Sequence, residues 1–115
     1  MLTVRPESVE AMQRDRLAEA NRLLLEYAQQ RYPSVFKPQN AQRTLKLVEQ
    51  IRERAAGYAI TREDNVATMI DLSTMYGLDF DQTPWAAGVL SNSKLPGPDK
   101  VSILQRRIRR QGAKI

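Results

Sequence analysis

The 115-residue sequence contains no histidine and no cysteine. Without imidazole or thiol groups, the chain cannot form a Ser-His-Asp or Cys-His nucleophile, a histidine switch near neutral pH, or a usual zinc site. Only carboxylate, lysine or tyrosine chemistry remains. Because a chain without cysteine gains nothing from an oxidising compartment, we expect a cytoplasmic location.

Long apolar runs are also missing. A membrane-spanning helix needs about 20 consecutive apolar residues, and no stretch of the sequence approaches that length. The first residues show no apolar segment behind a basic start, so we expect no secretion leader and no membrane partner. Five glycines, six prolines, 42% hydrophobic and 27% charged residues are typical of one soluble globular domain spanning residues 1–115.

Strand signals are absent as well, since no segment alternates apolar and polar residues and no Asn-Gly or Asp-Gly hairpin occurs. Apolar spacing together with proline and glycine positions predicts an all-α bundle of about five helices, at about 6–31, 40–56, 61–76, 83–90 and 98–110. We expect Thr61 and Thr83 to cap the third and fourth helices, and Gly57 to provide a left-handed cap after the second.

A stripe of apolar residues recurs mostly at steps of three or four along the first predicted helix, which predicts one long helix. Its members are Val9, Met12, Leu17, Ala20, Leu24, Tyr27 and Ala28. Pro33 and Pro38 make the segment from Tyr32 to Gln39 a connector, and we expect Val35 and Phe36 to hold this connector against the core.

Charge is unevenly distributed along the chain. Residues 1–91 hold 11 basic and 12 acidic residues, a net charge of −1, whereas residues 92–115 carry +6. Residues 63–93 contain five acids and no Lys or Arg. The sequence therefore predicts a near-neutral helical domain followed by a basic C-terminal linker and helix at 92–115.

The densest unusual cluster is Gly77-Leu78-Asp79-Phe80-Asp81, followed by Pro84-Trp85-Ala86. Its acids lack the alternation, central glycine and closing glutamate of a calcium loop, so we expect no metal site. One interpretation makes Phe80 and Trp85 core anchors, with Asp79 or Asp81 capping the next helix. The other makes Asp79, Phe80, Asp81 and Trp85 a surface for a partner.

The last predicted helix has two different faces. Val101, Leu104 and Ile108 lie on one side, and the other side carries Lys100, Arg106, Arg107, Arg109 and Arg110. This pattern is typical of a docked terminal helix whose cations complement its own dipole, of a surface for an acidic protein, or of a phosphate-binding surface. Because no aromatic residue lies among these arginines, nothing here would stack on or read a base.

Part of the sequence resembles a known family. The order Ala56-Gly57-Tyr58-Ala59-Ile60, Glu63-Asp64, Tyr76-Gly77-Leu78-Asp79-Phe80-Asp81 and Pro84-Trp85-Ala86 is similar to small helical proteins encoded in bacterial type VI secretion effector clusters. The resemblance covers about residues 55–90. It implies an accessory or co-chaperone role, in which the protein binds an effector chaperone or an effector for loading onto the secretion apparatus, and it supplies no catalytic residues.

Carboxylate pairs such as Glu63 with Asp64 are the residual enzyme candidates, but adjacent acids at helix starts are common in inert proteins. We therefore predict a non-catalytic adaptor without cofactor or metal, whose candidate partner-binding residues are Asp79, Phe80, Asp81, Trp85, Arg106, Arg107, Arg109 and Arg110. The alternatives are a small nucleic-acid-binding protein that uses the basic helix, and an immunity protein that uses the acidic segment. The sequence leaves the identity and stoichiometry of the partner open.

Overall fold

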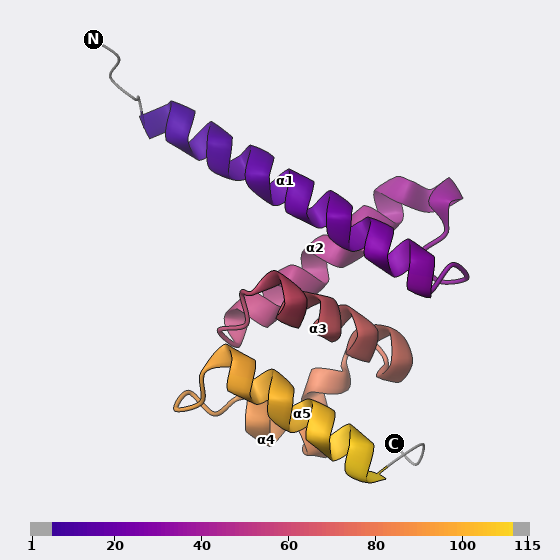
Figure 1. Ribbon diagram of the computed structural model, residues 1–115, viewed down its shortest axis with the longest axis vertical. Coiled ribbons are helices and arrows are strands. Elements are labelled where there is room, and N and C mark those ends of the chain that lie inside the picture. The colour runs from indigo at the N-terminus through magenta and orange to yellow at the C-terminus, as the bar shows by residue number, and fades with distance from the viewer. Residues whose placement is uncertain (1–5, 112–115) are drawn as a thin grey trace.

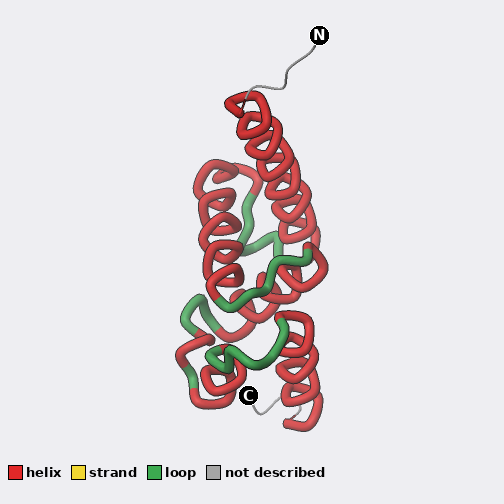
Figure 2. Tube along the Cα trace, turned by 90° about the vertical axis from the view of Figure 1, so that its left-hand side faces the viewer, coloured by secondary structure: helices red, strands yellow, loops and turns green. Residues whose placement is uncertain are grey.

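A computed structural model describes residues 6–111 of the chain, with side chains described for residues 10–109. Its helices are α1 (Pro6–Arg31), α2 (Ala41–Gly57), α3 (Glu63–Tyr76), α4 (Pro84–Leu90) and α5 (Gly97–Gln111). Single 3₁₀ turns at Pro38–Asn40 and Phe80–Gln82 precede α2 and α4. No strand occurs among the described residues (Figure 2), and the predicted all-α bundle is confirmed.

Prolines and glycines set most helix ends. The backbone leaves helical geometry at Tyr32, directly before Pro33, because a proline disfavours helical geometry in the preceding residue. Pro84 occupies the first turn of α4, where its missing amide has no partner to lose. Gly77 ends α3 with φ +99, a conformation that a residue with a Cβ rarely adopts.

The left-handed residue after α2 is Ala59 and not Gly57, so that prediction is wrong. Gly57 is still helical, whereas Ala59 has φ 64. The amide of Ile60 donates to the carbonyl of Ala55 at 2.8 Å, and the amide of Ala59 donates to Ala56 at 3.0 Å. This is the Schellman pattern, which needs its left-handed residue two positions beyond Gly57.

The predicted side-chain caps are also wrong. Arg62 precedes α3 in place of Thr61, and no side chain caps this helix. Thr83 does stand at the cap position of α4, but its hydroxyl donates back to the carbonyl of Phe80. Neither Asp79 nor Asp81 caps α4. Asp79 pairs with Arg54, and the side chain of Asp81 is buried.

Helix α3 lies at the centre of the fold (Figure 1). It contacts α1 and α2 on one side and α5 on the other, and α4 packs against α5. The core is continuous through these contacts. Its most deeply buried large side chains are Phe36, Ile51, Ile60, Met69, Ile70, Leu72, Leu90 and Leu104.

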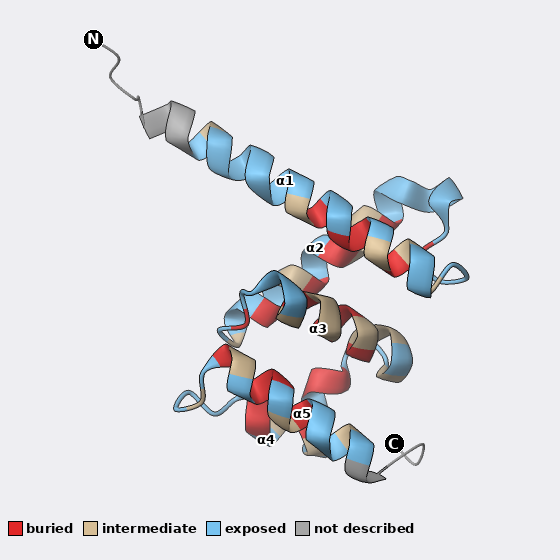
Figure 3. Ribbon diagram, in the orientation of Figure 1, coloured by how far each residue is buried: buried red, intermediate tan, exposed pale blue. Residues whose placement is uncertain are grey.

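Only the C-terminal half of α1 takes part in this core. The first buried side chain of the described part of α1 is Asn21, followed by Leu24, Leu25 and Ala28. Met12 and Leu17, two members of the apolar stripe in the first half of the helix, are 53% and 47% exposed. Helix α1 extends past α2 with its exposed half outward (Figure 3). The radius of gyration is accordingly 16.1 Å, against about 13 Å for a compact domain of this size.

Candidate protein-binding surfaces

The predicted aromatic pair in the segment after α3 is divided between core and surface. Phe80 is 2% exposed, whereas Trp85 is only partly buried. The Trp85 ring stacks near Phe80 at 6.0 Å between centroids and meets Tyr76 edge-on at 5.4 Å. Phe80 is therefore a core anchor, and Trp85 packs against it while its own side chain stays partly exposed.

Asp81 holds this segment against the end of α2. Its carboxylate accepts a hydrogen bond from the Tyr58 hydroxyl at 2.5 Å and one from Arg54 at 3.1 Å. Arg54 also donates to the carbonyl of Leu78 and pairs with Asp79. Burial, and then the hydrogen bond to Asp81, raise the pKa of Tyr58 to about 12. Of the two acids proposed for a partner, only Asp79 presents an exposed side chain.

Helix α5 docks through its apolar stripe as predicted, with Val101 and Leu104 buried. Lys100 does not belong to the exposed basic face, because it is 3% exposed and its ammonium donates to the carbonyl of Tyr58 at 2.8 Å. Arg106, Arg107 and Arg109 are exposed, and Arg107 donates to the carbonyl of Trp85 at 2.6 Å. The side chain of Arg110 lies outside the described part.

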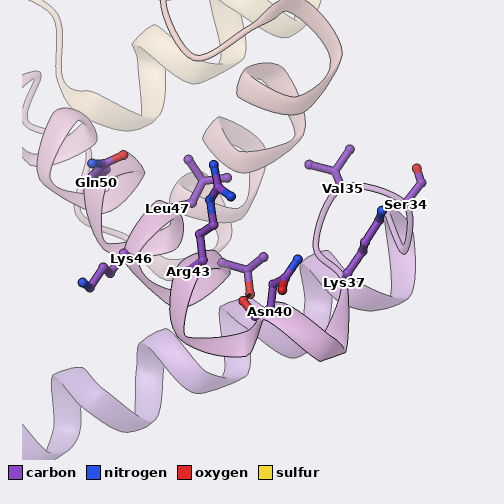
Figure 4. A pocket seen from close by; sticks show the side chains of 9 residues that line it. Ser34, Val35, Lys37, Asn40, Arg43, Lys46, Leu47 and Gln50 are labelled. Carbon is purple, nitrogen blue, oxygen red and sulfur yellow. Dashed lines mark hydrogen bonds between the residues drawn. The ribbon is translucent and has the colours of Figure 1, made fainter.

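A cleft of about 600 Å³ was not predicted from the sequence. It lies between the connector after α1 and the first turns of α2 (Figure 4). Its wall includes the apolar side chains of Val35 and Leu47, together with three cations, Lys37, Arg43 and Lys46. We call this the basic cleft.

The local sequence explains the geometry of the basic cleft. Pro33 and Pro38 prevent the connector from continuing α1, and Phe36 anchors it with a fully buried ring. Two turn hydrogen bonds, from Val35 and Phe36 to the carbonyl of Tyr32, close the connector. With Phe36 directed into the core, the adjacent Val35 is left 49% exposed, which corrects the expectation that both hold the connector to the core.

No acidic residue of the described part of the chain lines the basic cleft. Within the described chain, none of its three cations forms a salt bridge with a carboxylate. The charge pattern contained a signal for this site, because residues 27–48 hold four basic residues and no acid. This stretch was not predicted as a site because the C-terminal segment 92–115 carries the larger excess of positive charge.

Comparison with known proteins adds no assignment. No protein family, curated protein or solved structure matches the chain. Among the described residues, no group of three or more potential metal-ligating side chains lies together, and no helix is long and apolar enough to cross a membrane. The resemblance to type VI secretion accessory proteins stays a prediction.

Proposed function

We propose that the protein is a non-catalytic adaptor that binds an acidic surface of a protein partner through the basic cleft. The observation that carries this proposal is the wall of the cleft, where exposed Val35 and half-buried Leu47 lie among three cations that have no salt-bridge partner within residues 10–109. Apolar groups in the centre of a patch supply affinity on burial, and surrounding charges supply orientation and association rate. An acidic partner with an apolar centre complements both.

The chemistry of the cleft favours a protein over a nucleic acid. Nucleic acids without sequence preference are held by cations combined with aromatic rings on which bases stack. The cleft has the cations but no aromatic side chain in its wall. Val35 and Leu47 would gain little from a phosphate backbone, whereas an apolar side chain of a protein would cover them.

The resemblance over residues 55–90 supports a more specific partner. It implies that the chain is an accessory or co-chaperone protein that binds an effector chaperone, or the effector itself, before type VI secretion. A cytoplasmic location accompanies this role. The proposed mechanism is stoichiometric binding, with no cofactor and no bond made or broken.

The test is affinity capture from the native cell with matched baits, followed by binding measurements on the purified partner. The cleft variant carries Lys37→Gln, Arg43→Gln and Lys46→Gln, all at exposed positions. The control variant removes the same charge elsewhere through Arg14→Gln, Arg16→Gln and Lys94→Gln, which are also exposed. We expect to find a protein that is captured by the wild type and by the control variant but not by the cleft variant.

Salt dependence separates the two classes of partner. A nucleic acid held by the three cations should lose affinity with a log-log slope of about −3, because each neutralised phosphate contributes about −0.9. A protein bound around Val35 and Leu47 should show a shallower slope. Two results would contradict the proposal. One is that the protein binds only nucleic acid, with the steep slope, and the other is that the cleft variant captures the same proteins as the wild type.

A further inference from the structure

A second groove lies on another part of the molecule, where the C-terminal ends of α1 and α3 meet α5. Its volume is about 300 Å³, at the lower limit of ligand clefts. We call it the Arg31 groove, because Arg31 lines one wall and Arg109 of α5 lines the other. A groove this small accepts one anchoring side chain and its neighbours, and not a folded domain.

The apolar lining of the groove is incompletely covered. Leu72 is buried and Ile108 is partly buried, but Met75 is 53% exposed. Methionine is flexible and polarisable, and exposed methionines serve binding surfaces that adapt to their ligands. An apolar side chain from outside would bury Met75 beside the buried Leu72.

Arg31 is held in place by Asp71 and two tyrosines, and its side chain stays 55% exposed. Its Nε donates to Asp71 at 3.1 Å, and its guanidinium carbon lies 5.2 Å and 5.9 Å from the ring centroids of Tyr27 and Tyr32. Both tyrosine hydroxyls donate to the same carboxylate at 2.7 Å. The Tyr32 hydroxyl is a further partner of the guanidinium and helps to raise the pKa of Arg31, and among the described residues Asp71 is the one carboxylate that pairs with it.

Such a guanidinium is suited to a carboxylate. A fork whose orientation is already fixed loses little entropy when it receives two parallel hydrogen bonds. Asp71 accepts three hydrogen bonds and compensates one positive charge, so Arg31, Arg109 and Asp71 together leave the groove at +1. The excess charge selects an acidic ligand and disfavours a basic one.

The geometry points to a peptide-binding groove for a short segment of a protein partner in which an acidic residue lies beside a large apolar side chain. The carboxylate would bind the Arg31 fork, and the apolar side chain would cover Met75. This inference deepens the proposed adaptor function and rests on it in requiring a protein partner. It adds a contact that is separate from the basic cleft.

The test begins with a random dodecapeptide display library selected on the wild-type protein and counter-selected on a Met75→Asp variant. We expect enrichment of sequences with Asp or Glu next to Leu, Ile, Phe or Met. Titration of an enriched peptide should then show a dissociation constant at least about tenfold higher for Arg31→Gln and for Met75→Asp. Arg31→Lys, which keeps the charge and loses the fork, should weaken binding by about fivefold.

Arg106→Gln is the matched control, because Arg106 is an exposed arginine on α5 that does not line the groove. It should stay within about twofold of wild type, whereas Arg109→Gln should weaken binding by about threefold. Met75→Asp changes an exposed side chain, so this variant tests the groove even if Arg31→Gln perturbs the Asp71 cluster. Circular dichroism verifies that each variant is folded.

Two results would overturn the inference. One is a selection that enriches no acidic and apolar sequence, and the other is an enriched peptide that binds wild type, Arg31→Gln and Met75→Asp equally. A different result would contradict the proposed function: affinity capture that yields no protein whose binding depends on the basic cleft. A partner that depends on the basic cleft but ignores Arg31 and Met75 would leave the adaptor function standing and remove the peptide groove.

Discussion

Replacing Gly97 with alanine would place a methyl group inside the backbone of another segment. Gly97 is the buried first residue of α5, and an added Cβ would lie 2.1 Å from the carbonyl oxygen of Ala59 and 2.9 Å from its carbonyl carbon. Real Cβ atoms essentially never approach a neighbour within 3.0 Å. The two backbones must therefore separate by about 1 Å, because no flexible side chain is available to yield.

That separation strains contacts that dock the start of α5. The Lys100 ammonium lies 2.8 Å from the carbonyl of Tyr58, and Val101 is 2% exposed. Overpacking of a well-packed site costs about 1–3 kcal/mol, and a clash between two backbones belongs at the upper end. We expect Gly97→Ala to lower the free energy of unfolding by about 3 kcal/mol, which lowers the melting temperature by about 12 °C.

Gly88→Ala is the matched control. Gly88 lies within α4, and an added Cβ would meet nothing within 4 Å. Alanine should raise stability there by about 0.5–1 kcal/mol, because glycine loses more backbone entropy in a helix. Thermal and urea unfolding followed by circular dichroism measure both variants. The reasoning is refuted if Gly97→Ala melts within about 2 °C of wild type, or if the two variants shift the melting temperature in the same direction.

Helix positions were predictable because proline and glycine act through local geometry. The break at Tyr32, the start of α4 at Pro84 and the end of α3 at Gly77 follow from steric limits that do not depend on the rest of the fold. These signals place each helix to within a few residues, even though nothing in the sequence shows which helices touch.

The turn after α2 shows where local reasoning stops. Gly57 is the residue that best tolerates left-handed geometry, yet Ala59 adopts it. The choice follows from Ile60, which is fully buried and whose amide closes the turn onto Ala55. The left-handed residue is therefore Ala59, because this conformation places the Ile60 side chain in the core. Gly97, which has no Cβ, leaves room for the carbonyl of Ala59.

The candidate sites show the same limit. Periodicity places Leu17 and Leu24 on related faces of α1, but only the position of α2 decides that Leu24 is buried and Leu17 is 47% exposed. The Arg31 groove joins residues about 40 positions apart in the sequence, such as Tyr32 and Asp71. Spacing rules work within one helix and carry no information on such pairs. Only the acid-free stretch 27–48 was visible beforehand as a hint of the basic cleft.

Three further perturbations test the same packing arguments. Ala59→Gly should raise stability by about 0.5–1 kcal/mol, because relief of a left-handed alanine exceeds the entropy cost of glycine, and a lowered melting temperature would contradict this. Trp85→Ala should lower the free energy of unfolding by about 2–3 kcal/mol, less than for a fully buried tryptophan, because Trp85 is only partly buried. Urea unfolding measures this loss, and an unchanged midpoint would place Trp85 outside the core. The third perturbation is alkaline pH. Burial, and then hydrogen bonds to Asp71 and Asp81, raise the pKa values of Tyr27 and Tyr58 to about 12 in the folded chain, whereas in the unfolded chain tyrosine ionises near about 10. A group whose folded pKa is raised contributes stability that is fully present below its unfolded pKa and is lost as the pH rises to the folded one. Burial also raises the pKa of Tyr32. Stability should therefore fall between about pH 10 and 12, and an absorbance titration of the native protein should show Tyr27, Tyr32 and Tyr58 ionising late. If all four ionise together near their ordinary pKa while the protein stays folded, the hydroxyls of Tyr27 and Tyr58 are not held by the two carboxylates, and the fixed orientation of Arg31 loses its basis.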